Sequence, residues 1–322
     1  MTIIKDISIV FISIFLEAMP FVLLGAIISS IIEHFISDDM IEKLIPKNAV
    51  LGSLFGILLG FFIPACDCAV IPISKRLIKK KVPINVAVSF MLASPIINPV
   101  VVIATYSAFS KVNPKIFYAR TLGGIIVSLI IGILMGIKFK GKDILKVDEK
   151  GVNRKGNLCN CHHEHNFEYG YMHENDLSEK NETKNKALNT LSCILEHTIK
   201  DFIDVLKFLI LGAFIASLVQ VFIPKNIIQI FASNKVLSII VLMVFAYVIS
   251  LCSTSDSFVG KSLLGSFGES GVIAYLLLGP MVDLKNTFVL FGNYEKKFVV
   301  TLISVIFIIV FLTALILGGI LW

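Results

Sequence analysis

Charged residues are scarce in this sequence. Asp, Glu, Lys and Arg make up only 16% of its 322 residues, against 56% hydrophobic residues, and the mean hydropathy is +0.86. Charged residues make up about 25% of an average soluble domain. The composition therefore excludes an ordinary soluble globular protein and indicates that the lipid bilayer is the main solvent of the chain.

Motifs of enzymes are also missing. The sequence shows no recognisable Ser-His-Asp set or dinucleotide fingerprint, and Gly260-Lys261-Ser262 lacks the rest of a phosphate-binding loop. The net charge of +6 lies in segments that flank apolar runs, not in a basic soluble domain of the kind that binds nucleic acid. We therefore predict neither an enzyme nor a nucleic-acid-binding protein.

Long apolar runs, by contrast, are abundant. A helix needs about 20 mainly apolar residues to cross a hydrocarbon core about 30 Å thick, and these runs are continuous rather than alternating as in barrel strands. No cleavage site of small residues follows the first run, so we expect it to be retained. We predict an all-α polytopic membrane protein with about eight transmembrane helices, near residues 7–33, 48–65, 84–108, 116–137, 199–222, 236–252, 271–291 and 298–321.

Basic residues in short connections predict the orientation. The stretch Lys75–Lys81 (KRLIKKK) is strongly basic, whereas the connection before residue 48 carries Asp38, Asp39 and Glu42. Lys and Arg are enriched in cytoplasmic loops. With eight spans, this places both termini and residues 138–198 in the cytoplasm, in a protein of the inner or plasma membrane.

Two parts of the sequence resemble each other. Leu23-Leu24-Gly25-Ala26 matches Ile210-Leu211-Gly212-Ala213 at an offset of 187 residues. Cys66 aligns with Cys252 at an offset of 186, and Asn98 aligns with Asp283 at 185. We predict two repeat-related halves of four helices, residues 1–137 and 199–322. If the proline-rich stretches are re-entrant, the number of crossings changes and an inverted repeat becomes possible.

Residues 138–198 differ from both halves. They are rich in Asn, Lys, Glu and His and too polar to bury a core, which predicts a flexible cytoplasmic insert. The insert contains thiols and imidazoles that suit Zn, Cu or Ni, although not in the C-x2-C spacing of a closed zinc site. The candidate metal ligands are Cys159, Cys161, His162, His163 and His165.

Polar breaks interrupt the apolar runs in three places. Pro64 and Pro72 bracket Cys66-Asp67-Cys68, where an unwound backbone would place both thiols on one face. Broken helices at membrane depth are tolerated beside cavities and are typical of transporter sites. We predict that the solute site is formed by Cys66, Asp67, Cys68, Ser94, Asn98, Cys252, Ser253, Ser255, Asp256 and Asp283.

Each break also has a structural interpretation. Cysteines are common as small buried apolar residues, and Ser94-Pro95 with Asn98-Pro99 could simply kink a packing helix. Asp256 could cap a helix that begins at Ser257. These alternatives remain open at the level of the sequence.

A charge at the centre of a span is expensive, at about 2.5–3.5 kcal/mol on insertion scales. Glu17 therefore needs a reason, and we predict Glu17 and its repeat counterpart Asp204 as candidates for proton coupling. The alternative for Asp204 is an ion pair with Lys200 or Lys207 on its own helix.

The combination of Pro64-x-Cys66-x-Cys68-x-x-x-Pro72, Ser94-Pro95-x-x-Asn98-Pro99, Ser255-Asp256-Ser257-Phe258 and Gly279-Pro280-x-x-Asp283 resembles the ArsP/YraQ family of predicted permeases. The resemblance covers both halves but not the insert. It implies an inner-membrane permease, and for some members export of trivalent organoarsenicals through thiols, here Cys66, Cys68 and Cys252. Asp67 stands where the family motif has serine.

The main hypothesis is thus a secondary permease that exports a thiophilic solute, such as a trivalent organoarsenical or a soft metal species. One alternative is a permease, or a subunit of one, for a divalent metal or other small solute. Another is a membrane thiol-redox protein that cycles Cys66 and Cys68, although C-x-C is a poorer geometry for this than C-x-x-C. We expect no resident cofactor, and a second membrane subunit or a homo-oligomer as partner.

Overall fold

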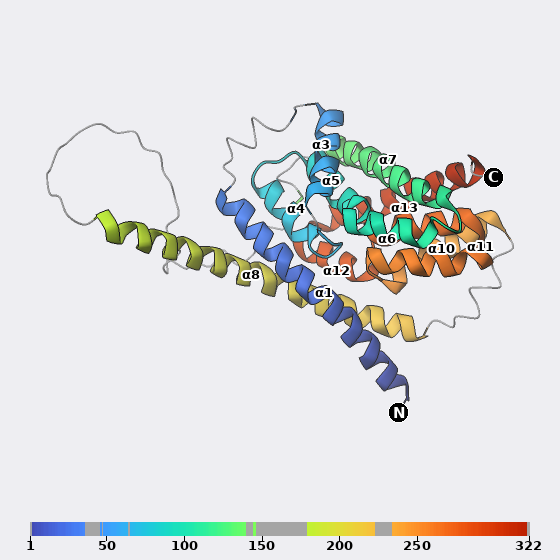
Figure 1. Cartoon of the computed structure of the whole chain (residues 1–322), viewed down its shortest axis with the longest axis horizontal. Helices are drawn as coiled ribbons and strands as arrows, with labels where there is room; N and C mark the ends of the chain where they lie inside the picture. The colour runs from blue at the N-terminus through green and yellow to red at the C-terminus, as the bar shows by residue number, and fades with distance from the viewer. Residues whose placement is uncertain are drawn as a thin grey trace.

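The computed structural model describes residues 2–35, 46, 48–63, 65–139, 144, 145, 179–222 and 234–320, and in these ranges the chain is a bundle of helices without named strands (Figure 1). The predicted all-α class is therefore confirmed. The first part of the chain contains α1 (Thr2–Phe35), α3 (Ala49–Phe62), α4 (Val70–Lys79), α5 (Ile84–Ile97), α6 (Pro99–Phe109) and α7 (Pro114–Lys138). The second contains α8 (Glu179–Phe222), α10 (Lys235–Ile249), α11 (Ser253–Met281), α12 (Leu284–Asn293) and α13 (Lys296–Ile320).

The helices fall into two length classes. Five stretches in the described residues are long and apolar enough to cross a membrane, and the pair α5 and α6, bent by 42° at Asn98, makes a sixth. At 1.5 Å per residue, α3 with 14 residues and α10 with 15 are each about 21–23 Å long and too short for a core of about 30 Å. The described helices thus account for up to six of the eight predicted crossings.

The first short helix is followed by a break and a return. α3 and α5 run side by side in the same direction, because Asn85 donates to the Ala49 carbonyl at 2.8 Å near their starts, and Gly60 lies against Ser94 further along. The non-helical residues after α3 lead into α4, which runs back and reaches α5 through a turn at Lys81 (φ 63°). All of α5 is buried.

The second short helix is followed by a similar return. α10 ends at Ser250 in the left-handed region (φ 52°), and α11 starts at Ser253. α11 consists of two arms joined at Gly268, whose φ of 70° only glycine adopts without strain. Nearly every residue from Ser270 to Val282 is buried, so the second arm lies in the centre of the bundle.

Both broken crossings have a capped second helix. The Asn98 side chain accepts from the Val100 amide at 3.0 Å at the start of α6, and the Asp283 side chain accepts from the Asn286 amide at 2.6 Å at the start of α12. Such caps satisfy backbone donors that would otherwise be left unpaired in the membrane. These two predicted site residues therefore have clear structural roles.

α1 and α8 cross the bundle side by side along one flank (Figure 1). Their contact buries Ile14 of α1 against Ala213 and Ala216 of α8, and Phe11 packs edge-on against Phe214. Their outward faces expose large apolar side chains such as Leu16 and Ile203, as expected for helices that face lipid.

Candidate functional site

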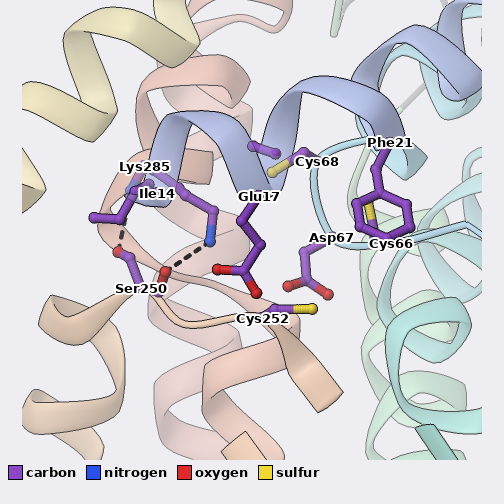
Figure 2. A pocket seen from close by; sticks show the side chains of 10 residues that line it. Ile14, Glu17, Phe21, Cys66, Asp67, Cys68, Ser250, Cys252 and Lys285 are labelled. Carbon is purple, nitrogen blue, oxygen red and sulfur yellow. Dashed lines mark hydrogen bonds between the residues drawn. The ribbon is translucent and has the colours of Figure 1, made fainter. Parts of the chain in front are cut away.

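One polar pocket lies where the two parts of the chain meet (Figure 2). Glu17 comes from α1, and Cys252 and Ser250 come from the break between α10 and α11. The full lining is Ile14, Glu17, Ala18, Phe21, Cys66, Asp67, Cys68, Ser250, Cys252 and Lys285. The prediction that Cys66, Asp67, Cys68 and Cys252 share one site is consistent with this lining.

The segment between α3 and α4 carries the first group of these residues. Residues 65–69 form a non-helical turn, closed by the Ala69 amide donating to the Cys66 carbonyl at 3.0 Å. Asp67 is 4% exposed, and its carboxylate accepts a hydrogen bond from the Ser253 hydroxyl at 2.8 Å. This bond joins the break in the first half directly to the break in the second.

The three cysteines in the described breaks are free thiols with different surroundings. Cys68 is buried, and its thiol donates to the Asn286 side-chain oxygen of α12 at 3.4 Å. Cys66 and Cys252 are half-buried and line the pocket beside the Asp67 and Glu17 carboxylates (Figure 2). Cys66 and Cys252 are therefore the thiols best placed to bind a soft solute.

A buried cation closes one side of the pocket. Lys285 is 4% exposed, and its ammonium donates to the Asp283 carboxylate at 2.6 Å and to the Ser250 carbonyl at 2.9 Å. A buried charge is tolerated only when it is paired and hydrogen-bonded in this way. Lys285 thereby holds the start of α12 against the break between α10 and α11.

A second buried cation lies next to the start of α11. Arg120 of α7 is 1% exposed and donates to the Ser253 carbonyl at 2.9 Å, to the Thr105 hydroxyl at 2.9 Å and to the Ser257 hydroxyl. The guanidinium fixes the first turn of α11, which carries the Ser253 hydroxyl that contacts Asp67. Arg120 thus acts on the pocket residue Asp67 through Ser253 and does not line the pocket itself.

Asp256 lies in the same polar layer, away from the pocket lining. α11 already begins at Ser253, so the alternative in which Asp256 caps a helix starting at Ser257 is wrong. The Asp256 carboxylate accepts from the Tyr275 hydroxyl at 2.9 Å, and its second oxygen is buried without a hydrogen-bond partner against Gly279. Ser255 is half-buried and does not line the pocket.

Ser94 contacts the backbone of the segment that carries the pocket cysteines. It is fully buried, and its hydroxyl points at the Ile63 and Ala65 carbonyls, at 3.5 and 3.4 Å. These carbonyls belong to the non-helical segment after α3, where the Ile63 carbonyl also accepts from the Ala65 amide at 2.7 Å, and non-helical backbone inside a membrane needs such partners. Ser94 therefore stabilises the break and is not in direct reach of the pocket.

The two candidates for proton coupling differ. Glu17 lines the pocket, with its carboxylate directed toward Asp67 and Cys252 (Figure 2). Asp204 is two-thirds exposed and pairs with Lys207 at 3.3 Å, as the alternative interpretation predicts. Of the two, only Glu17 is placed to exchange a proton with the site.

The predicted metal ligands Cys159, Cys161, His162, His163 and His165 lie outside the described residues. Within the part of the chain that the structure describes, no group of three or more His, Cys, Asp or Glu side chains has the arrangement of a metal site. The pocket has a volume of about 20 Å³. It therefore has room for a single water or small ion and is closed to a larger solute in this conformation.

Sequence reasoning missed Lys285 and Arg120. Both lie inside predicted spans, 271–291 and 116–137, where the cost of an intramembrane charge that singled out Glu17 applies equally. A second cavity of about 670 Å³ beside α3, α5 and α7 has Thr121 as its only polar side chain, so it offers no comparable site.

The helices and the pocket together define a polytopic membrane protein with a thiol-lined pocket between residues of the first and second parts of the chain. Comparison with known proteins gives the family: residues 3–319 match the ArsP_1 family model, described as predicted permease, and the chain belongs to this family. The resemblance in the motifs is thereby confirmed, and a permease rather than an enzyme is what the family supports.

Two relatives match over nearly their whole lengths. The UPF0718 protein YcgR of Bacillus subtilis (strain 168) is 40% identical over 312 residues, which is 96% of each chain. A protein of Streptococcus mutans serotype c, provisionally named a two-component membrane permease complex subunit, is 36% identical over 309 residues, or 96% of this chain and 94% of the relative. No solved structure matches the chain.

Proposed function

We propose that this protein is a secondary permease of the cell membrane whose solute site lies between its two halves. The observation that carries the proposal is the shared pocket: Cys66 and Asp67 from one half and Cys252 from the other face it together with Glu17. Sites at the interface of two halves, formed by broken helices, are what alternating access requires.

The lining favours a thiophilic solute. Two half-buried free thiols are soft ligands suited to a trivalent organoarsenical or a soft metal ion. The family resemblance makes export the expected direction. A specific observation also supports a divalent cation as the solute, since the carboxylates of Glu17 and Asp67 lie beside the thiols. Glu17 is the candidate for coupling transport to protons.

The experiment is an accumulation assay in cells that over-produce the protein, with methylarsenite, Cd²⁺ and Zn²⁺ as separate probes. Export predicts lower accumulation of the transported probe than in cells with an empty vector. Cys66→Ala and Cys252→Ala should abolish that difference for a thiophilic probe, and Glu17→Gln should reduce it at every pH if Glu17 carries the coupling proton.

The matched control is Ser304→Ala, since Ser304 lies on the exposed face of α13 and its hydroxyl donates only to the Val300 carbonyl of the same helix. Ser304→Ala should transport as the unmodified protein does. Equal accumulation in cells with the unmodified protein and with both cysteine variants, for every probe, would remove the thiols from the proposal.

Two further parts of the proposal concern partners. The name of the S. mutans relative supports a second membrane subunit, which co-purification from the native membrane would test. The Cys159–His165 cluster is proposed as a metal-responsive element of the insert. Deleting residues 150–180 should leave transport intact and remove only its response to added metal; loss of transport itself would contradict this separation.

A further inference from the structure

The segment from α3 to α4 enters and leaves one end of the bundle. α3 and α5 begin side by side, as the Asn85 to Ala49 bond of 2.8 Å shows, and Asn85 also lies against Gly136 near the end of α7. α4 ends at Lys79, five residues before α5 begins. The start of α3 and the end of α4 are therefore at the same end, beside the basic residues Lys79–Lys81.

The segment from α10 through the first arm of α11 enters and leaves the bundle at the opposite end. The Ser238 hydroxyl donates to the Phe267 carbonyl at 2.7 Å, and the Lys235 ammonium donates to the Gly318 carbonyl at 2.7 Å. Asn113 in the turn between α6 and α7 bonds to Glu269. Since that turn lies at the far end of α7 from Gly136, these contacts mark the other end of the bundle.

We infer that residues 49–79 and 235–267 are two re-entrant hairpins that enter the membrane from opposite faces and meet tip to tip. Each half then makes three crossings. In the first half these are α1, the bent pair of α5 and α6, and α7. In the second half they are α8, the second arm of α11 together with α12, and α13. An odd number of crossings per half makes the two halves an inverted repeat.

The contact between the tips has the signature of a two-fold relation. At the offset of 186 residues that aligns Cys66 with Cys252, the partner of Asp67 is Ser253, and these two side chains are hydrogen-bonded at 2.8 Å. Equivalent residues of two related units touch each other only where they lie on the symmetry axis. Asp67 and Ser253 therefore lie on the axis that relates the halves.

The turns of the hairpins correspond as well. Lys81, between α4 and α5, and Gly268, between the arms of α11, both have positive φ, 63° and 70°, and they are 187 residues apart. A lysine with positive φ is uncommon, which makes the turn at Lys81 a distinctive feature of the first half, and the turn of the second half has glycine, the residue that adopts positive φ most readily. The order of short helix, break, return arm and positive-φ turn is thus the same in both halves.

The tips also meet the requirement for non-helical backbone inside a membrane, which must be satisfied by surrounding protein. Ser94 donates to the carbonyls of Ile63 and Ala65. Lys285 donates to the Ser250 carbonyl, and Arg120 donates to the Ser253 carbonyl. Helices of 14 and 15 residues, about 21–23 Å long, reach past the midplane of a core about 30 Å thick without crossing it.

The functional consequence rests on the proposed function. Because the solute site lies between the tips, each hairpin separates it from one face of the membrane. The Asp67 to Ser253 bond and the small pocket, about 20 Å³, describe a state in which both hairpins are closed. Withdrawal of one tip opens the site to that face alone. The topology itself is independent of any transport activity.

The test is the location of the termini relative to the insert. Three crossings per half place residues 138–198 on one face and both termini on the other, whereas eight crossings place all three on the same face. Full-length protein is fused after Trp322 to green fluorescent protein, active in the cytoplasm, or to signal-less alkaline phosphatase, active outside it. The same reporters inserted between residues 150 and 178 provide the internal reference.

The expected result is phosphatase activity at the C-terminus and fluorescence in the insert, with each signal normalised to the amount of full-length fusion in the membrane. An epitope tag at the N-terminus should be accessible on unpermeabilised spheroplasts. Both reporters active in the same compartment would overturn the inference. If the topology holds while cells with the unmodified protein accumulate every probe as cells with an empty vector do, the proposed function fails and the inverted arrangement stands.

Discussion

The two halves differ in what their first helix packs on. α1 packs on the end of its own hairpin, with Gly25 close to the backbone of Ala69, whereas α8 packs on α12, with Gly212 close to the backbone of Lys285. Gly25 and Gly212 are equivalent in the predicted repeat, but Ala69 and Lys285 are not. The α1 and α8 pair is therefore placed asymmetrically on the remainder of the bundle.

The surfaces left uncovered show the same asymmetry. In the predicted repeat, the counterpart of Lys285 is Val100 on α6, which is 60% exposed, and Ile103 on the same helix is 65% exposed. Transporters with inverted repeats change access by moving one group of helices against another around a fixed site. If the inferred inverted repeat is correct, it predicts a second state in which the halves exchange arrangements and α1 packs on α6.

The largest effect is expected from removing Lys285, a buried cation whose counterpart in the predicted repeat is the neutral Val100. Lys285→Met leaves the buried Asp283 carboxylate unpaired, and loss of one partner of a buried pair costs about 3–5 kcal/mol. Val100→Ala, at the equivalent exposed position, should change stability by about 0.5 kcal/mol or less. Thermal unfolding of the detergent-purified variants measures both.

Asp283→Asn retains an oxygen that can cap α12, so the double variant Lys285→Met with Asp283→Asn should recover part of the stability. Equal unfolding temperatures for Lys285→Met and Val100→Ala would mean that the pair does not hold α12 in place.

The glycine contacts should give the next largest effect. A Cβ at Gly25 would lie 2.6 Å from the Ala69 Cβ, and one at Gly212 would lie 2.8 Å from the Lys285 carbonyl oxygen. Gly25→Ala and Gly212→Ala should each cost about 1–3 kcal/mol through overpacking. The control is Gly265→Ala, which meets nothing within 4 Å and should be neutral or stabilising, as alanine favours a helix. Three variants of equal stability would contradict close packing of α1 on Ala69 and of α8 on α12.

A smaller effect is expected at the hairpin tips. Ser253→Ala removes the one hydrogen bond that joins the tips in the described structure, and a single bond contributes about 0.5–1.5 kcal/mol. This corresponds to a change of about two- to tenfold in the balance between closed and open tips. The half-saturating probe concentration in the accumulation assay should shift by that factor, and an unshifted value would place the gate elsewhere.

The sequence was sufficient to locate the apolar runs and the breaks. Proline and polar residues inside long apolar runs are local features, so the segments around Cys66, Asn98 and Cys252 could be found without a structure. The predicted repeat places the breaks at Cys66 and Cys252 at equivalent depths, whereas Asn98 does not line the pocket. The pocket lining of Cys66, Asp67, Cys252 and Glu17 agrees with that reasoning.

The return arms of the hairpins could not be found by hydropathy. α4 contains Lys75, Arg76 and Lys79 and resembles a basic loop, although most of it is buried, and Asn293 accepts a hydrogen bond from Lys75 at 3.1 Å. The first arm of α11 begins with Ser-Thr-Ser-Asp and is too polar for a span. The first arm of α11 buries its polar residues Ser253, Asp256 and Ser257 but exposes Phe258 and Lys261. Contacts of individual side chains therefore determine the conformation of both arms, and an average over residues does not reveal it.

The smallest signal is expected from the second state itself, in which α1 packs on α6, because that state is the less populated one. Phe208 of α8 packs on Gly292 of α12, and the equivalents of these residues are Phe21 and Ser107. Phe21 lines the pocket here, and Ser107 is exposed.

In Phe21→Cys with Ser107→Cys, oxidation of cells should form a disulfide slowly, and faster when a transported probe keeps the protein cycling. Phe208→Cys with Gly292→Cys should form its disulfide quickly with or without probe, because that contact already exists. Mass spectrometry of the linked peptides measures both yields. A Phe21 to Ser107 link that never forms, beside a complete Phe208 to Gly292 link, would mean that α1 stays on α4 and that the asymmetry is permanent.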